Sequence, residues 1–172
     1  EQKALLVGLT LAQARALVGE QYRLLNSVLL PGLAKQGVIF PRREDWTGAQ
    51  SAWIRDYFMR ELLPVLTPIG LDPAHPFPRV LNKSLNLAVE LEGRDSFGRK
   101  SRAAIVQAPR ALPRVIRLPA ELSDGSQDFV LLSGVLQEFV EELFPGMQVK
   151  GSYQFRVTRN SDLFVDEEEI DD

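Results

Sequence analysis

The chain has 172 residues, of which 45% are apolar, and this suits one ordinary domain, or one domain plus an appendage, with a sizeable core. It contains no cysteine, which excludes disulfides and thiolate metal sites and favours a reducing compartment. No apolar run approaches the roughly 20 residues that span a bilayer, and no signal-peptide pattern is present. The chain opens at Glu1 rather than at Met, which suggests an excised or processed piece. We therefore expect a soluble, cytoplasmic domain.

The net charge of −3 conceals an uneven distribution along the chain. Seven of the eleven residues from 162 to 172 are acidic, so residues 1–161 hold 20 basic and 16 acidic side chains and carry +4. Residues 94–117 contain seven bases and one acid, Asp95. A base-rich segment attracts polyanions or acidic protein surfaces in a salt-dependent way, and it equally suits the solvated rim of a hairpin.

Two capping-box patterns predict helices in the N-terminal part of the chain. Thr10 followed by Gln13 predicts the start of a long first helix, whose apolar residues recur at helical spacing as far as Pro31-Gly32. Thr47 followed by Gln50 predicts a second helix, which Pro64 ends. The connection through residues 37–43 suggests that the two helices form an antiparallel pair packed on another element.

Five of the eleven prolines fall within residues 64–78. Proline fixes φ and disfavours helix at the residue before it, so we expect a stiff, extended loop rather than a floppy linker. The apolar residues Leu66, Ile69, Leu71 and Phe77 predict that this loop packs onto the domain.

From residue 84 the apolar period changes to two, which predicts strands. Residues 85–92 and 103–107 are expected to form the two arms of a hairpin. Residues 115–118 and 129–132 predict further short strands, and residues 134–144 predict a later helix that Pro145-Gly146 ends.

The last predicted strand, residues 149–157, shows the cleanest alternation. It places Tyr153 and Phe155 on an apolar core face and Arg156 on the opposite, wet face. With the preceding elements, it predicts an α+β fold in which long N-terminal helices and one later helix pack on a mainly antiparallel β-sheet.

Common catalytic signatures are missing from the sequence. It has no GxxxxGK[ST] phosphate loop, no GxGxxG after a strand, no HExxH and no GxSxG. The single histidine, His75, lies between prolines, where a structural role fits better than catalysis, and one histidine near Asp72 is too few ligands for a metal site. The acidic end lacks the alternating ligands and central glycine of an EF-hand loop, so we expect a solvated helix start or hinge there.

Three segments stand out, in order along most of the chain: Leu66-Thr67-Pro68 with Asp72-Pro73-Ala74-His75-Pro76-Phe77-Pro78 and Asn82-Lys83-Ser84-Leu85-Asn86-Leu87; Leu112-Pro113-Arg114-Val115-Ile116-Arg117-Leu118-Pro119; and the exit at residues 155–169. They resemble motifs of the polyphosphate kinase family, and more narrowly of its head, or middle, domain. The resemblance implies a head domain at residues 1–161, followed by an acidic segment, 162–172, that leads to catalytic domains.

The resemblance also implies an activity for the parent enzyme. That family transfers the terminal phosphate of ATP reversibly to polyphosphate through a phosphohistidine, with magnesium, and acts as an oligomer. No catalytic residue of the family matches a position here, and His75 does not match the phosphorylated histidine, so the isolated chain is predicted to be inactive and to hold no cofactor or metal. The expected partners are the remaining domains of the same polypeptide, further copies of the parent enzyme, and polyphosphate. The parent enzyme is expected in the cytoplasm, with peripheral membrane association left open.

Polyphosphate carries about one negative charge per unit, and arginine donates to phosphate in a planar fork. The polyphosphate-facing candidates are Arg156, Arg159 and Asn160 at the strand exit, and more weakly Asn82 and Lys83. Two alternatives remain open. Arg156 and Arg159 could pair only with the acidic run, or the chain could be an adaptor whose segment 94–117 binds acidic partners or nucleic acid. Nucleic acid is not expected, because Tyr153 and Phe155 fall on the predicted apolar face, away from Arg156.

Overall fold

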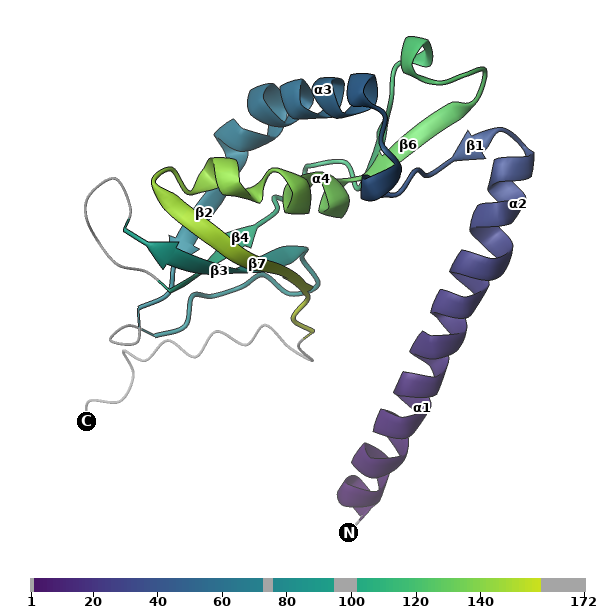
Figure 1. The fold of residues 1–172 in the computed structure, drawn as a ribbon. Helices are drawn as coiled ribbons and strands as arrows, with labels where there is room; N and C mark the ends of the chain where they lie inside the picture. Colours follow the sequence, from purple (N-terminus) through teal and green to yellow (C-terminus); the bar gives the residue numbers. More distant parts are fainter. Residues whose placement is uncertain (1, 73–75, 95–101, 159–172) are drawn as a thin grey trace. The chain divides into compact units, whose positions relative to one another are not determined.

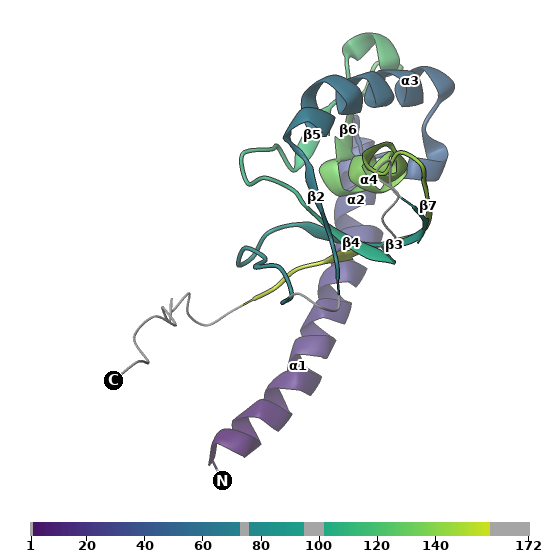
Figure 2. The same ribbon diagram turned by 90° about the vertical axis from the view of Figure 1, so that its left-hand side faces the viewer.

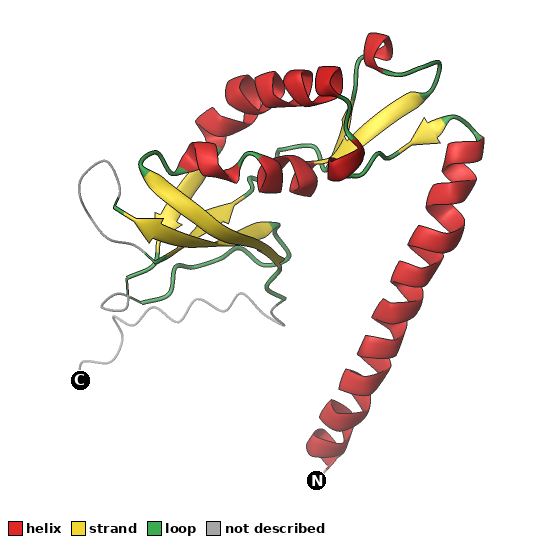
Figure 3. Ribbon diagram, viewed as in Figure 1, coloured by secondary structure: helices red, strands yellow, loops and turns green. Residues whose placement is uncertain are grey.

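The computed structural model describes residues 2–72, 76–94 and 102–158, with side chains from Leu11 onward. The fold is α+β, as predicted, and its helices, strands and loops are distinguished in Figure 3. The chain divides into two compact units. The first comprises Glu1–Trp46 and Val115–Val130, and the second comprises Thr47–Arg114 and Leu131–Asp172. No described helix is both long and apolar enough to cross a membrane.

The first unit begins with one long continuous helix (Figure 1). It consists of α1 (Gln2–Leu24), a π-helical turn η1 (Leu25–Leu29) and α2 (Leu30–Lys35). The predicted start at Thr10 is wrong, because residues 2–9 include no proline and mostly favour helix, so the helix begins at Gln2.

The predicted end of this helix at Pro31-Gly32 is also wrong, because the helix continues beyond these residues. A proline ring inside an α-helix clashes with the carbonyl four residues earlier. Here the N–H of Leu30, just before Pro31, donates to the Leu25 carbonyl oxygen in a wider, π-type turn. The wider turn relieves the crowding around the ring, and the helix continues to Lys35.

The first unit also contains a small sheet of three strands in the order β1-β6-β5. The strands are β1 (Val38–Ile39), β5 (Val115–Arg117) and β6 (Gln127–Leu131), with the short helices η2 (Arg43–Asp45) and η5 (Ala120–Leu122) between them; Leu131 itself belongs to the second unit. Strand β1 pairs in parallel with β6, with Val38 opposite Gln127. Two apolar residues were too short a signal for β1 to be predicted.

The second unit is built on a four-stranded antiparallel sheet in the order β2-β4-β3-β7. Its strands are β2 (Thr67–Gly70), β3 (Asn86–Gly93), β4 (Ala103–Gln107) and β7 (Met147–Phe155). The predicted hairpin of β3 and β4 is confirmed, with Leu87 opposite Val106. Leu87, Val89 and Val106 are fully buried or nearly so, which places the core on this face of the sheet.

Helices cover that face of the sheet. They are α3 (Gly48–Tyr57), continued by η3 (Phe58–Leu62) and η4 (Leu63–Val65), and α4 (Leu132–Glu138), followed by η6 (Val140–Leu143). Figures 1 and 2 both place α4 between α3 and the sheet. The rings of Phe58 and Phe139 lie 5.5 Å apart, and Arg55 forms an ion pair with Glu142 at 2.7 Å.

The second capping box is confirmed. The Thr47 hydroxyl oxygen accepts from the Gln50 N–H at 3.2 Å, and the Gln50 side chain accepts from the Thr47 N–H at 3.0 Å. The expected antiparallel packing of the two N-terminal helices stays a prediction, because α1 and α3 belong to different units.

The alternation predicted for the last strand is wrong in its second half. Strand β7 pairs Leu91 with Val149 but Glu90 with Gly151, so Lys150 forms a bulge and the faces exchange beyond it. Ser152 and Gln154 therefore share the face of Leu87 and Val89. Tyr153 lies opposite Ala88 on the other face and is 61% exposed rather than in the core.

The Pro-rich stretch is more ordered than a loop in its first part. Thr67–Gly70 forms β2, an edge strand, where Pro68 costs no central ladder bond. Leu66 is buried, and Ile69 and Leu71 are half-buried, as expected of a segment that packs onto the domain. The expectation for Phe77 is wrong, because its side chain is 64% exposed.

A candidate polyanion-binding corner

The structure brings together three of the five predicted polyphosphate-facing residues. The backbone N–H of Lys83 donates to the Val157 carbonyl oxygen at 2.8 Å, which places the turn containing Asn82 and Lys83 beside the exit of β7. Arg156 is the residue immediately before Val157. Arg159 and Asn160 lie outside the described residues.

Arg110, which the candidate residues did not include, joins this group. Its Nη2 donates a hydrogen bond to the Asn82 carbonyl oxygen, across 28 positions of sequence. It belongs to the predicted basic segment 94–117, and that charge pattern was the only sequence signal for it. We call Asn82, Lys83, Arg110 and Arg156 the basic corner.

The turn at residues 81–84 has an unusual backbone. The N–H and the hydroxyl of Ser84 both donate to the Leu81 carbonyl oxygen, at 3.4 and 2.7 Å, and this closes the turn. Lys83 has a φ of 56°, and it is the one non-glycine residue with positive φ in the part of the chain that the structure describes. Glycine and asparagine occupy such left-handed positions most readily.

A buried polar pair anchors this turn to the sheet. Ser84 is 1% exposed and Asn86, the first residue of β3, is fully buried. The Asn86 amide donates to the Ser84 carbonyl oxygen at 3.0 Å and to its hydroxyl oxygen at 3.1 Å. Because these groups satisfy one another away from water, the turn is held in place by the sheet beneath it.

The basic corner is positively charged. Lys83, Arg110 and Arg156 are all exposed, and the side chains of Lys83 and Arg156 form no ion pair with any described carboxylate. Arg110 uses one of its N–H groups for the Asn82 carbonyl, and its side chain makes no other hydrogen bond among the described residues. Three exposed cations without described acidic partners form a surface that favours an anion with several charges.

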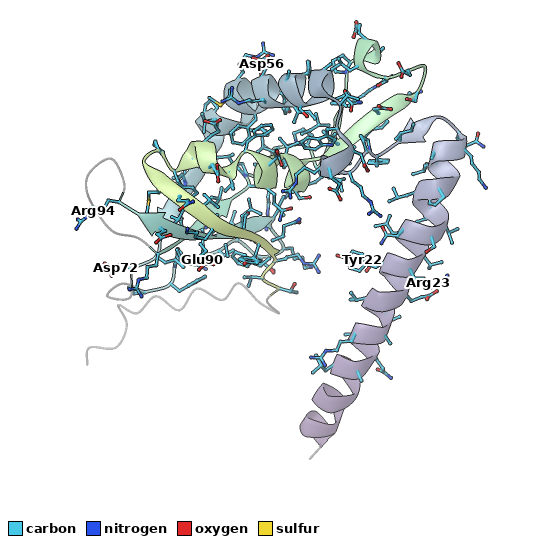
Figure 4. The ribbon with its side chains drawn as sticks, in the orientation of Figure 1. Tyr22, Arg23, Asp56, Asp72, Glu90 and Arg94 are labelled. Atoms are coloured by element: carbon cyan, nitrogen blue, oxygen red, sulfur yellow. The ribbon has the colours of Figure 1, made fainter. Side chains whose placement is uncertain are left out.

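Arg94, at the start of the basic segment, lies away from the corner. Arg94 follows the far end of β3 and extends outward there (Figure 4). The last residue of the strand, Gly93, is already seven residues, or roughly 23 Å, from Asn86. Arg117 belongs to the other compact unit. Two further bases of the segment, Arg99 and Lys100, lie outside the described residues, as do His75 and the acidic run.

The described residues offer little for a metal ion. They contain no group of three or more carboxylate or imidazole side chains that could hold one.

The second unit is thus an α+β domain with a cationic corner at the exit of its last strand. Residues 49–172 match the family model described as the polyphosphate kinase middle domain. The chain therefore belongs to the polyphosphate kinase family.

Individual relatives agree with this assignment. A polyphosphate kinase of Neisseria meningitidis serogroup A is 64% identical over 157 residues, covering 91% of this chain and 23% of the relative. One from Burkholderia vietnamiensis is 60% identical over 162 residues, covering 94% and 24%. The crystal structure of polyphosphate kinase from Porphyromonas gingivalis matches with a TM-score of 0.78 and 27% identity, over 96% of this chain and 26% of that one. The chain spans about a quarter of the length of these relatives.

Proposed function

We propose that this chain is the middle domain of an enzyme that transfers the terminal phosphate of ATP reversibly to polyphosphate, and that it supports assembly and contacts the polymer. Its membership of the family and the match to a polyphosphate kinase structure support this proposal. ATP and magnesium belong to the parent enzyme. The described residues provide no cluster of three metal-binding side chains.

The basic corner is the observation that supports the proposed contact with polyphosphate. A polyphosphate chain presents a charged oxygen group at every unit, and arginine and lysine are the side chains that bind such groups. The Lys83 N–H donates to the carbonyl oxygen of Val157, the residue after Arg156, although 73 residues separate Lys83 from Arg156 in sequence. A polymer with closely spaced charges can contact several cations of such a corner at once, whereas a single small anion contacts fewer.

The helix of the first unit supports the assembly role. Its exposed apolar residues include Leu11, Val18 and Leu25, which recur every seven residues, and Leu17 is 70% exposed. Figure 4 shows Tyr22 and Arg23 leaving the helix on different sides, and Arg23 pairs with Glu20 at 2.6 Å. An apolar stripe this long suits packing against another helix in the assembled enzyme.

The polymer contact is tested in the full-length enzyme with the double substitution R156A/R159A. We expect the KM for long-chain polyphosphate to rise about tenfold while the KM for ATP stays unchanged. The matched control is R94A/R102A, which removes two exposed arginines of the second unit at the opposite end of β3 and β4. An unchanged polyphosphate KM in R156A/R159A would leave standing the alternative that these arginines only pair with the acidic run.

The assembly role has its own test. V18E/L25E places two charges on the apolar stripe of α1 and η1, and we expect it to lower the mass of the full-length enzyme in sedimentation or light scattering. The control A16E/R23E alters the polar side, where Glu20 and Arg23 lie. An unchanged mass and stability in V18E/L25E would exclude the stripe from assembly.

A further inference from the structure

We infer that the turn of residues 81–84 is a preformed phosphate-binding subsite, with Lys83 presenting its ammonium group to a bridging or terminal phosphate oxygen of the polymer. The inference rests on the proposed function and names a subsite within it. Three observations carry it: the backbone of Lys83, the bonds that hold the turn, and the charges beside it.

The first observation is the residue type at the left-handed position. A side chain with a Cβ is disfavoured at positive φ, and asparagine or glycine relieves the strain. Here asparagine stands one position earlier, at Asn82, and lysine occupies the strained position with φ of 56°. A residue in an unfavourable backbone conformation persists only where the surrounding structure holds it there. Such residues cluster at functional sites.

The second observation is how firmly the turn is held. Its residues are bonded to three separate segments: Lys83 N–H to Val157 after β7, the Asn82 carbonyl to Arg110 after β4, and Ser84 to the buried Asn86 of β3. The backbone that carries the lysine is therefore fixed before any ligand arrives. A preorganised contact loses less entropy on binding than one on a mobile loop.

The third observation is that two arginines neighbour Lys83 in the fold. Arg110 bonds directly to the residue before Lys83, and Arg156 precedes the residue that accepts the Lys83 N–H bond. Consecutive phosphates of one polymer can contact these cations together, while orthophosphate or a single triphosphate cannot fill as many contacts. The subsite is therefore expected to discriminate by chain length.

The decisive variant is K83G in the full-length enzyme. Glycine suits the left-handed backbone, so the Tm should stay unchanged or rise. Removal of the charge should weaken binding of long-chain polyphosphate about fivefold to tenfold at low salt, with little change for tripolyphosphate. The slope of log affinity against log salt should fall by roughly 0.7, the value for one contact on a single-stranded polyanion.

Two further variants sharpen the result. K83R keeps a cation at the turn and should retain most of the affinity. K35Q removes an exposed lysine from the end of α2 in the other unit and should change neither affinity nor slope.

The binding measurements on K83G and R156A/R159A distinguish the subsite from the proposed function. Weaker polyphosphate binding by K83G with an undiminished Tm supports the subsite. Unchanged binding by K83G, in an enzyme that R156A/R159A does weaken, overturns the subsite and leaves the proposed function standing. Unchanged binding in both variants overturns the polymer-contact role of the whole corner.

Discussion

Lys83 and Val157 are linked by a backbone hydrogen bond of 2.8 Å that joins the turn before β3 to the exit of β7. The bond connects two of the three segments through which the chain resembles polyphosphate kinases, the one containing residues 82–87 and the one beginning at residue 155. It therefore places two motifs that are far apart in the sequence beside each other in the fold.

The capping box of α3 should be measurable as stability. T47A removes the hydroxyl that accepts the Gln50 N–H, and we expect it to lower the free energy of unfolding by about 1 kcal/mol. Urea denaturation followed by tryptophan fluorescence measures this directly. T47S keeps the oxygen and should retain most of the stability; equal losses in T47S and T47A would assign the effect to the methyl group instead.

The core beneath α3 should depend on one aromatic ring. Phe58 is fully buried and packs against Phe139, so F58A should cost about 3–5 kcal/mol through lost burial and a cavity. M59A, at the adjacent position with 37% exposure, should cost far less in the same urea experiment. Similar losses for the two variants would contradict the burial pattern.

Two glycines of the second unit should respond differently to alanine. Gly146 has a φ of 85°, so G146A forces a Cβ into the left-handed region and should cost about 1 kcal/mol or more. At Gly151 an added Cβ would lie 2.7 Å from the Tyr153 hydroxyl oxygen and 2.9 to 3.0 Å from two atoms of its ring. Because that ring is the exposed end of a rotatable side chain, it can swing away, and G151A should cost less than G146A in thermal unfolding. The reverse order would contradict the backbone assignment at these positions.

The ion pair between Lys150 and Glu92 should be visible in a titration. The Lys150 ammonium lies 2.6 Å from the Glu92 carboxylate and holds the pKa of Glu92 below its ordinary value of 4.5, through a hydrogen bond first and charge second. Side-chain NMR should show the pKa of Glu92 returning to its ordinary value in K150M. Because the folded pKa is lowered, the small stabilisation is present above pH 4.5 and is lost as the pH falls through the folded pKa. A Glu92 pKa that K150M leaves unchanged would mean that the pair does not form in solution.

Local signals in the sequence predicted the elements with strong periodicity or caps. The Thr47 capping box and the β3–β4 hairpin were found because each depends on residues close in sequence. The Thr10 pattern failed because a helix can run through a threonine when the residues before it also favour helix. The stop at Pro31 failed because a π-type turn makes room for the ring.

Features that depend on pairing between strands could not be read from one strand. The bulge at Lys150 exchanges the faces of β7, and alternation along β7 contains no sign of it because β3 sets the register. The same limit applies to the candidate site. Asn82, Lys83 and Arg156 were named from motifs and charge, but Arg110 joins them only through a contact across the fold.

The central claim is that this domain contacts polyphosphate through its basic corner. It is tested most directly by binding of long-chain polyphosphate to the full-length enzyme across a salt series, with ATP and double-stranded DNA as competitors and R156A/R159A beside the wild type. The account predicts binding that weakens with salt, that DNA displaces poorly, and that R156A/R159A reduces about tenfold. Wild-type affinity in R156A/R159A, or equal displacement by DNA, would contradict it.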